Sequence, residues 1–160
     1  RSVEAMSEET AYIMIDMLKG VIDGAYNRQT GKRMGTGVRI RGSSRPYAKF
    51  RGPLAGKTGT TQNNSDGWFI GLTSDLATGV WVGAEDRSVR FRSTPLGQGA
   101  NMALPIFGYY MQKVYSDKRI KISHDDFEKP EKPLRQEIDC EKYNKNNTIN
   151  KFGPVEEMID

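Results

Sequence analysis

Apolar side chains recur at helical spacing in two stretches of the chain. The first begins at Ser7, which is suited to cap a helix and precedes two glutamates that favour the positive end of the helix dipole. Its apolar positions are Ala11, Met14, Ile15, Leu18 and Ile22, widened by Tyr12, Ile13, Met17 and Val21. We predict a helix that ends at Gly24 and is covered on more than one side.

The second helical stretch spans residues 101–116. Its apolar stripe consists of Leu104, Phe107, Met111, Val114 and Tyr115. Pro105 is expected in the first turn, where a missing N–H costs least. This helix is predicted to pack across a β-sheet.

Three segments between the helices have the composition of β-strands: residues 53–61, 68–73 and 77–83. Strands this close in sequence form an antiparallel meander. The run from Trp68 to Leu72 does not alternate apolar and polar residues, so both sheet faces are expected to be covered, with the two tryptophans in the core. The predicted fold class is α+β, a three-stranded antiparallel meander covered by two helices.

The remaining segments lack a sustained hydrophobic period. Residues 27–52 and 85–98 are predicted to be irregular, with a short extended piece at residues 38–40. Residues 118–160 are dense in charged and asparagine side chains. We therefore predict one domain over residues 1–117, followed by a polar, weakly structured tail over residues 118–160.

Charge and composition exclude several function classes. The net charge of +4 is what an ordinary solvated surface would give. Nucleic-acid binding would need a clustered basic face, whereas the basic residues of positions 32–51 are spread over a predicted loop, so no nucleic-acid partner is predicted. The single cysteine, Cys140, excludes an intrachain disulfide, and together with the single histidine, His124, it cannot form a conventional zinc site. Neither residue is expected to be catalytic. No apolar run is long enough to span a bilayer.

The stretch Ala55-Gly56-Lys57-Thr58-Gly59-Thr60-Thr61 carries the strongest chemical signal. A lysine flanked by glycines allows the backbone to approach an anion closely at Gly56 and Gly59. A phosphate-binding P-loop needs four residues between its glycines and continues into a helix. Here three residues separate Gly52 from Gly56, and a turn and a strand follow, which argues against a nucleotide site.

Other catalytic arrangements fit the sequence poorly. A Ser-His-Asp triad would require His124, which lies in the predicted tail. The acidic residues nearest the central stretch are Asp66, Asp75, Glu85 and Asp86, and nothing distinguishes them from solvated loop charges. Paired carboxylates for glycoside chemistry are therefore not indicated.

Lys-Thr-Gly on a strand is a signature element of penicillin-binding proteins and serine β-lactamases. Here Gly56 precedes it, Thr60-Thr61 and an Asn/Asp-rich turn follow it, and two tryptophan-bearing strands come next. With this context, residues 55–83 resemble the end of the transpeptidase domain of class A (bifunctional, 1A-type) penicillin-binding proteins. The resemblance extends over roughly residues 1–117.

The resemblance implies part of a D,D-transpeptidase that crosslinks peptidoglycan stem peptides ending in D-Ala-D-Ala through a serine acyl-enzyme, which β-lactams also form. Lys57 would supply positive charge, Thr58 and Thr60 would offer hydroxyls to the substrate carboxylate, and Gly59 would leave room for the substrate backbone. The backbone N–H of Thr60 would be an oxyanion donor. No cofactor or metal is implied. The implied location is the extracytoplasmic side of the membrane, with the anchor in an N-terminal segment absent here.

One departure from the family pattern is decisive for activity. The family's nucleophile lies in Ser-x-x-Lys and a second motif is Ser-x-Asn, both before Lys-Thr-Gly. No serine of this chain has lysine three residues later or asparagine two residues later. Both motifs are expected upstream of Arg1, so the chain alone is predicted to be inactive. Two strands of the family's five-stranded sheet would also be missing, which predicts dimerisation or pairing with the missing N-terminal part.

Two alternatives remain open from sequence. One is a fragment of a serine β-lactamase or a penicillin-sensor domain, and the other is a non-catalytic cell-wall binding module. Thr60-Thr61 and the Asn/Asp-rich turn favour the class A synthase. A glycosyltransferase domain upstream would identify the bifunctional class, whereas a parent protein without Ser-x-x-Lys would identify the binding module.

Overall fold

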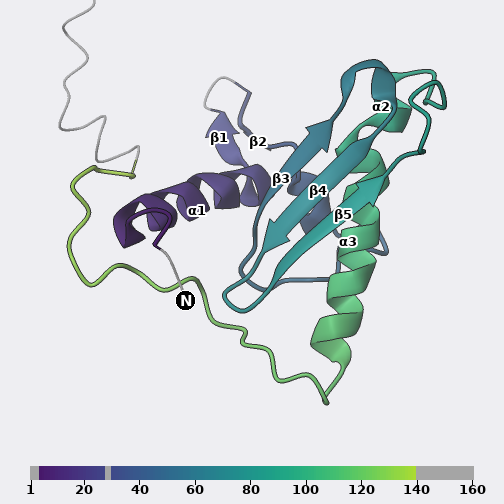
Figure 1. The fold of residues 1–160 in the computed structure, drawn as a ribbon. Helices are drawn as coiled ribbons and strands as arrows, with labels where there is room; N and C mark the ends of the chain where they lie inside the picture. The colour runs from purple at the N-terminus through teal and green to yellow at the C-terminus, as the bar shows by residue number, and fades with distance from the viewer. Residues whose placement is uncertain (1–3, 28–29, 140–160) are drawn as a thin grey trace, which may run out of the picture.

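A computed structural model describes residues 4–27 and 30–139 of the chain. A three-stranded sheet lies at its centre, with one long helix behind it and another at its side (Figure 1). The elements are α1 (Glu8–Asp23), β1 (Ala25–Asn27), β2 (Lys32–Met34), η1 (Val38–Arg41), β3 (Ala55–Thr60), η2 (Gln62–Asn64), β4 (Gly67–Leu72), β5 (Ala77–Val82), α2 (Thr94–Gly97) and α3 (Gly99–Ser116), where η denotes a 3-10 helix.

The central sheet is the predicted antiparallel meander, with strand order β3-β4-β5. Its register pairs Lys57 with Ile70 and Trp68 with Trp81. The strand bounds differ from the prediction by at most two residues. The α+β class and the three-stranded meander with two covering helices are confirmed.

Helix α3 packs across one face of this sheet, and the C-terminal end of α1 reaches the same face beside β3. The side chain of Phe69 points to that face, and its ring centroid lies 4.8 Å from that of Phe107 in α3. A Cβ at Gly71 would collide with the Phe107 ring, so only glycine lets α3 approach this closely. The buried core consists of Ile22, Ile40, Phe50, Leu54, Phe69, Ala103, Leu104, Phe107 and Met111.

The other face of the sheet is open in the described structure. Trp68, Ile70 and Trp81 lie on it with exposures of 44%, 41% and 46%. The prediction that both faces are covered and that the tryptophans belong to the core is therefore wrong. Alternate residues of β4 point to opposite faces, and the unbroken apolar run supplies both a buried and an uncovered face.

Helix α1 has the predicted ends. Ser7 Oγ accepts a hydrogen bond from the Thr10 N–H at 3.3 Å, and Gly24 ends the helix with φ 78°. The prediction that it is covered on more than one side is wrong, because Ile22 is its one buried residue. Only the C-terminal end of α1 packs near β3, and the rest extends away from the sheet (Figure 1).

The segments predicted to be irregular contain short elements. Strands β1 and β2 form a hairpin, and residues 38–40 belong to the 3-10 helix η1, which buries Ile40, instead of an extended piece. Segment 85–98 contains α2. Helix α3 begins at Gly99, so Pro105 lies inside the helix and not in its first turn.

Residues 117–139 form no helix or strand and run back towards α1 (Figure 1). The Ser123 N–H donates to Asp75 Oδ2 at 2.6 Å, and Lys19 Nζ lies 2.7 Å from Asp126 Oδ2. The hydrogen bond from Lys19 holds the pKa of the Asp126 carboxyl below its usual value. Cys140 lies outside the described residues. Within those residues, no helix has the length and hydropathy needed to cross a membrane.

Candidate functional site

Residues Lys57, Thr58, Gly59 and Thr60 lie together on β3, at the edge of the sheet; we refer to these four as the carboxylate wall. The Thr61 N–H donates to the Asp66 carbonyl at 3.1 Å, just beyond the end of the strand pair. Hydrogen-bonded pairs alternate along an antiparallel ladder, so the backbone groups of Thr60 and Thr58 point away from β4. The Thr60 N–H thus faces the outer edge, which is the orientation that an oxyanion donor needs.

The lysine ammonium also lies at this outer edge. The side chain of Lys57 leaves β3 on the open face, and its Nζ turns back to donate to the Thr58 carbonyl at 2.7 Å. An ammonium has three N–H donors, so two remain for an anion. No carboxylate of residues 4–27 or 30–139 forms an ion pair with Lys57.

The hydroxyls of Thr58 and Thr60 differ in the hydrogen bonds that they can still donate. Thr60 Oγ1 accepts a hydrogen bond from the Gly99 N–H at 3.1 Å, which leaves the hydroxyl hydrogen of Thr60 free to donate. Thr58 Oγ1 instead donates to Thr36 Oγ1 at 2.9 Å. Of the two hydroxyls, that of Thr60 is the available donor for a carboxylate.

The two glycines of residues 55–61, Gly56 and Gly59, also have different roles. Gly56 is buried on the helix-covered face, where a Cβ would lie 2.7 Å from Phe69 Cζ and 3.3 Å from Ile22 Cδ1. Gly56 therefore permits core packing, and the prediction of ligand access there is wrong. Gly59 lies on the open face beside Trp68, so a backbone approach at Gly59 is compatible with the structure.

A buried polar cluster next to the carboxylate wall was missed from the sequence. Asp66 is buried, not a solvated loop charge: Thr61 Oγ1 and Ser65 Oγ each donate to its Oδ2 at 3.1 Å, and Trp81 Nε1 donates to its Oδ1 at 3.2 Å. The closeness in sequence of two hydroxyl residues, Thr61 and Ser65, to Asp66 was the signal from which this cluster could have been predicted. The cluster joins the end of β3 to β5.

Replacing Asp66 by asparagine is expected to lower the free energy of unfolding by about 1–3 kcal/mol. The amide is neutral and has one acceptor oxygen instead of two, so the charge-assisted hydrogen bonds from Thr61, Ser65 and Trp81 are weakened or rearranged. The midpoint of urea unfolding, followed by tryptophan fluorescence, measures this. Asp16→Asn on α1 is the control, expected to stay within about 0.5 kcal/mol. Equal stability of the Asp66 variant and the original chain would contradict the role of the cluster.

The remaining titratable residues singled out from sequence lie elsewhere. The His124 ring packs against Tyr115 near the end of α3, with ring centroids 4.9 Å apart, and takes no part in the carboxylate wall. Among the described residues, no group of three or more His, Cys, Asp or Glu side chains could hold a metal ion.

Comparison with known proteins places this edge strand in a family. No protein-family model matches the chain. Penicillin-binding protein 1A of Pseudomonas aeruginosa is 41% identical over 109 residues, which are 68% of this chain and 11% of that protein. The protein of the same name from Clostridium acetobutylicum is 33% identical over 119 residues, or 74% of this chain and 12% of the relative.

A solved structure agrees with these sequence matches. The crystal structure of penicillin-binding protein 1A from Haemophilus influenzae matches 74% of this chain with a TM-score of 0.54 and 29% identity, and the match covers 16% of that structure. The fold and these matches define part of a penicillin-binding transpeptidase domain. The chain belongs to the penicillin-binding protein 1A family, and it spans about one tenth of the length of its relatives.

Proposed function

We propose that β3 binds the substrate carboxylate in a serine-type peptidoglycan D,D-transpeptidase. The observation that carries the proposal is the presence of three donors within four residues of one edge strand: the Lys57 ammonium, the Thr60 hydroxyl and the outward Thr60 N–H. The ammonium and the hydroxyl would hold the carboxylate of a stem peptide or a β-lactam. The Thr60 N–H would stabilise the oxyanion. Thr58 would contribute its hydroxyl only by releasing Thr36, and Gly59 would let the substrate backbone lie along the strand.

In this proposal the bond-making residues come from a part of the protein outside this chain. The absence of Ser-x-x-Lys and Ser-x-Asn from the 160 residues supports it, as does the small share of the relatives that the chain spans. The partners are stem peptides ending in D-Ala-D-Ala and β-lactams, and the location is the extracytoplasmic side of a membrane.

Pairing with the rest of the protein belongs to the same proposal. The exposed apolar side chains of Trp68, Ile70 and Trp81 on the open sheet face support it, because patches of this kind mark surfaces that other protein segments cover. The division into a domain over residues 1–117 and a tail over residues 118–160 is likewise proposed.

The chain alone is expected to form no covalent adduct with a fluorescent penicillin. Acylation requires an activated nucleophile, and the chain supplies only recognition and charge. Denaturing electrophoresis after incubation measures this directly. A labelled band at the mass of the chain would contradict the assignment of the nucleophile to another segment.

A chimera tests recognition by the carboxylate wall. In penicillin-binding protein 1A of P. aeruginosa, the aligned segment is replaced by the corresponding part of this chain. The chimera is expected to be labelled by fluorescent penicillin, with the unmodified protein as the positive control. A chimera that folds, as judged by circular dichroism, yet takes up no label would contradict the proposed function.

A further inference from the structure

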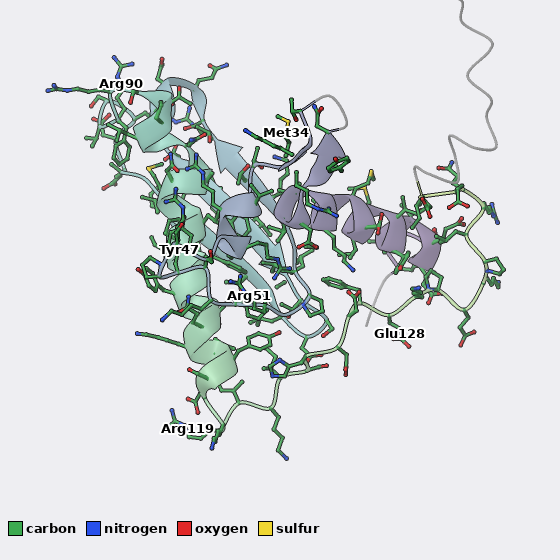
Figure 2. The ribbon with its side chains drawn as sticks, turned by 180° about the vertical axis from the view of Figure 1, so that it is seen from behind. Met34, Tyr47, Arg51, Arg90, Arg119 and Glu128 are labelled. Atoms are coloured by element: carbon green, nitrogen blue, oxygen red, sulfur yellow. The ribbon has the colours of Figure 1, made fainter. Side chains whose placement is uncertain are left out.

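A cavity of about 590 Å³ lies between the loop before β3 and the C-terminal half of α3. Its volume is in the range of small-molecule sites. None of its lining residues belongs to β3, so it is separate from the carboxylate wall. Figure 2 shows this side of the molecule, with Tyr47 and Arg51 labelled on the loop beside α3.

The walls of the cavity are held together by contacts between loop and helix. Gln112 Nε2 donates to the Pro46 carbonyl at 2.9 Å. The Phe50 ring packs edge-on against Tyr115 with centroids 4.6 Å apart, and the Tyr115 hydroxyl donates to the Ser123 carbonyl at 3.2 Å. The cavity is therefore formed before any ligand binds, which lowers the entropic cost of binding.

The charged side chains that line the cavity are all basic. Lys49, Arg51 and Lys113 line it, and none of the described lining residues is Asp or Glu. Within residues 4–27 and 30–139, no carboxylate forms an ion pair with any of these three cations. Arg51 donates one N–H to the Arg41 carbonyl at 3.2 Å and keeps four of its five donors.

We propose that this cavity binds a small phosphate monoester that carries a ring. Lysine and arginine side chains are the usual protein donors to phosphate oxygens. The aromatic side chains of Phe50, Tyr109 and Tyr115 line the same cavity and supply surfaces for the ring. The cations line a cavity of small-molecule size, which favours a soluble ligand over a membrane surface.

The single histidine of the chain provides a site-specific probe. His124 lines the cavity, and no other residue gives imidazole proton signals. Phenyl phosphate is titrated into the full chain at constant pH and ionic strength, and the His124 Cε1 proton is followed by NMR. The signal is expected to shift with saturation, and inorganic phosphate is expected to bind about 2- to 10-fold more weakly because it lacks the ring.

Matched variants distinguish binding in this cavity from non-specific attraction between the ligand and the positively charged protein. The double variant Lys49→Gln/Lys113→Gln is expected to weaken phenyl phosphate binding about 10-fold, because two charge-assisted hydrogen bonds are lost. Lys32→Gln/Lys129→Gln removes the same charge from exposed positions outside the cavity and is expected to change the affinity less than about 2-fold. Circular dichroism checks folding, and each Lys→Gln change is also made singly.

Several outcomes would overturn the proposal. One is a shift of the His124 signal that does not saturate, and another is equal weakening by both double variants. Equal affinity for phenyl phosphate and inorganic phosphate would show that the ring contributes nothing to binding, which would contradict a ring-bearing ligand. Co-sedimentation with phosphatidylglycerol vesicles but not phosphatidylcholine vesicles, in the absence of phenyl phosphate binding, would assign the cations to a lipid headgroup instead.

Discussion

Replacing Lys57 by methionine in the P. aeruginosa chimera is expected to slow penicillin labelling about 10- to 10²-fold. The substitution keeps an unbranched side chain of similar length and removes the ammonium that lies at the outer edge of β3. Hydrogen bonds to a charged group contribute about 1.5–3 kcal/mol, and each 1.4 kcal/mol is about tenfold in rate or affinity. The second-order rate constant of acylation, measured with a fluorescent penicillin, tests this expectation.

The control for this experiment is Lys32→Met, if the exchanged segment includes β2. Lys32 is an exposed lysine on that strand and lies outside the carboxylate wall. It is expected to leave the acylation rate within about 2-fold, because an isolated exposed charge is largely screened by salt. Comparable losses in both variants would mean that Lys57 acts through net charge and not through contact with the β-lactam carboxylate.

Replacing Phe107 by alanine is expected to lower the free energy of unfolding of the chain by about 3–5 kcal/mol, the usual cost of truncating a buried phenylalanine. Its side chain is inaccessible to solvent and packs against Phe69, and its ring fills the space left by Gly71. The loss would leave a void between α3 and the sheet. Urea unfolding followed by circular dichroism measures the change.

The neighbouring position gives a matched control for this truncation. Ile106 precedes Phe107 on α3 and is 50% exposed, so Ile106→Ala is expected to change the free energy of unfolding by no more than about 0.5 kcal/mol. If the two substitutions cost the same, contact between α3 and the sheet would not be the main source of stability.

The order of elements around β3 was predictable because it depends on local signals. The Asn/Asp-rich turn after Thr61 and the short connection after Leu72 give a meander from chain geometry alone. Ser7 and Gly24 set the ends of α1 through bonds and dihedral angles within a few residues of each. The Lys-Thr-Gly stretch and its context pointed to the penicillin-binding proteins, and the relatives confirm that family.

What the sequence could not provide depends on residues far apart in the chain. Whether Trp68 is buried depends on a second layer above the sheet, and the composition of β4 is the same with or without that layer. The burial of Asp66 depends on Trp81, which reaches it from β5. The different roles of Thr58 and Thr60 depend on Thr36 and Gly99, which lie on other elements.

The hydrogen bond between Gly99 and Thr60 has an electrostatic consequence. Aligned peptide dipoles place about half a positive charge at the N-terminus of a helix, and Gly99 is the first residue of the 18-residue helix α3. The oxygen of Thr60 accepts from that end of the helix, and accepting this bond makes the hydroxyl hydrogen a stronger donor. If β3 binds a carboxylate as proposed, its affinity is linked to the formation of α3, and fraying of the first turn of α3 would weaken that binding with the Lys57 charge unchanged.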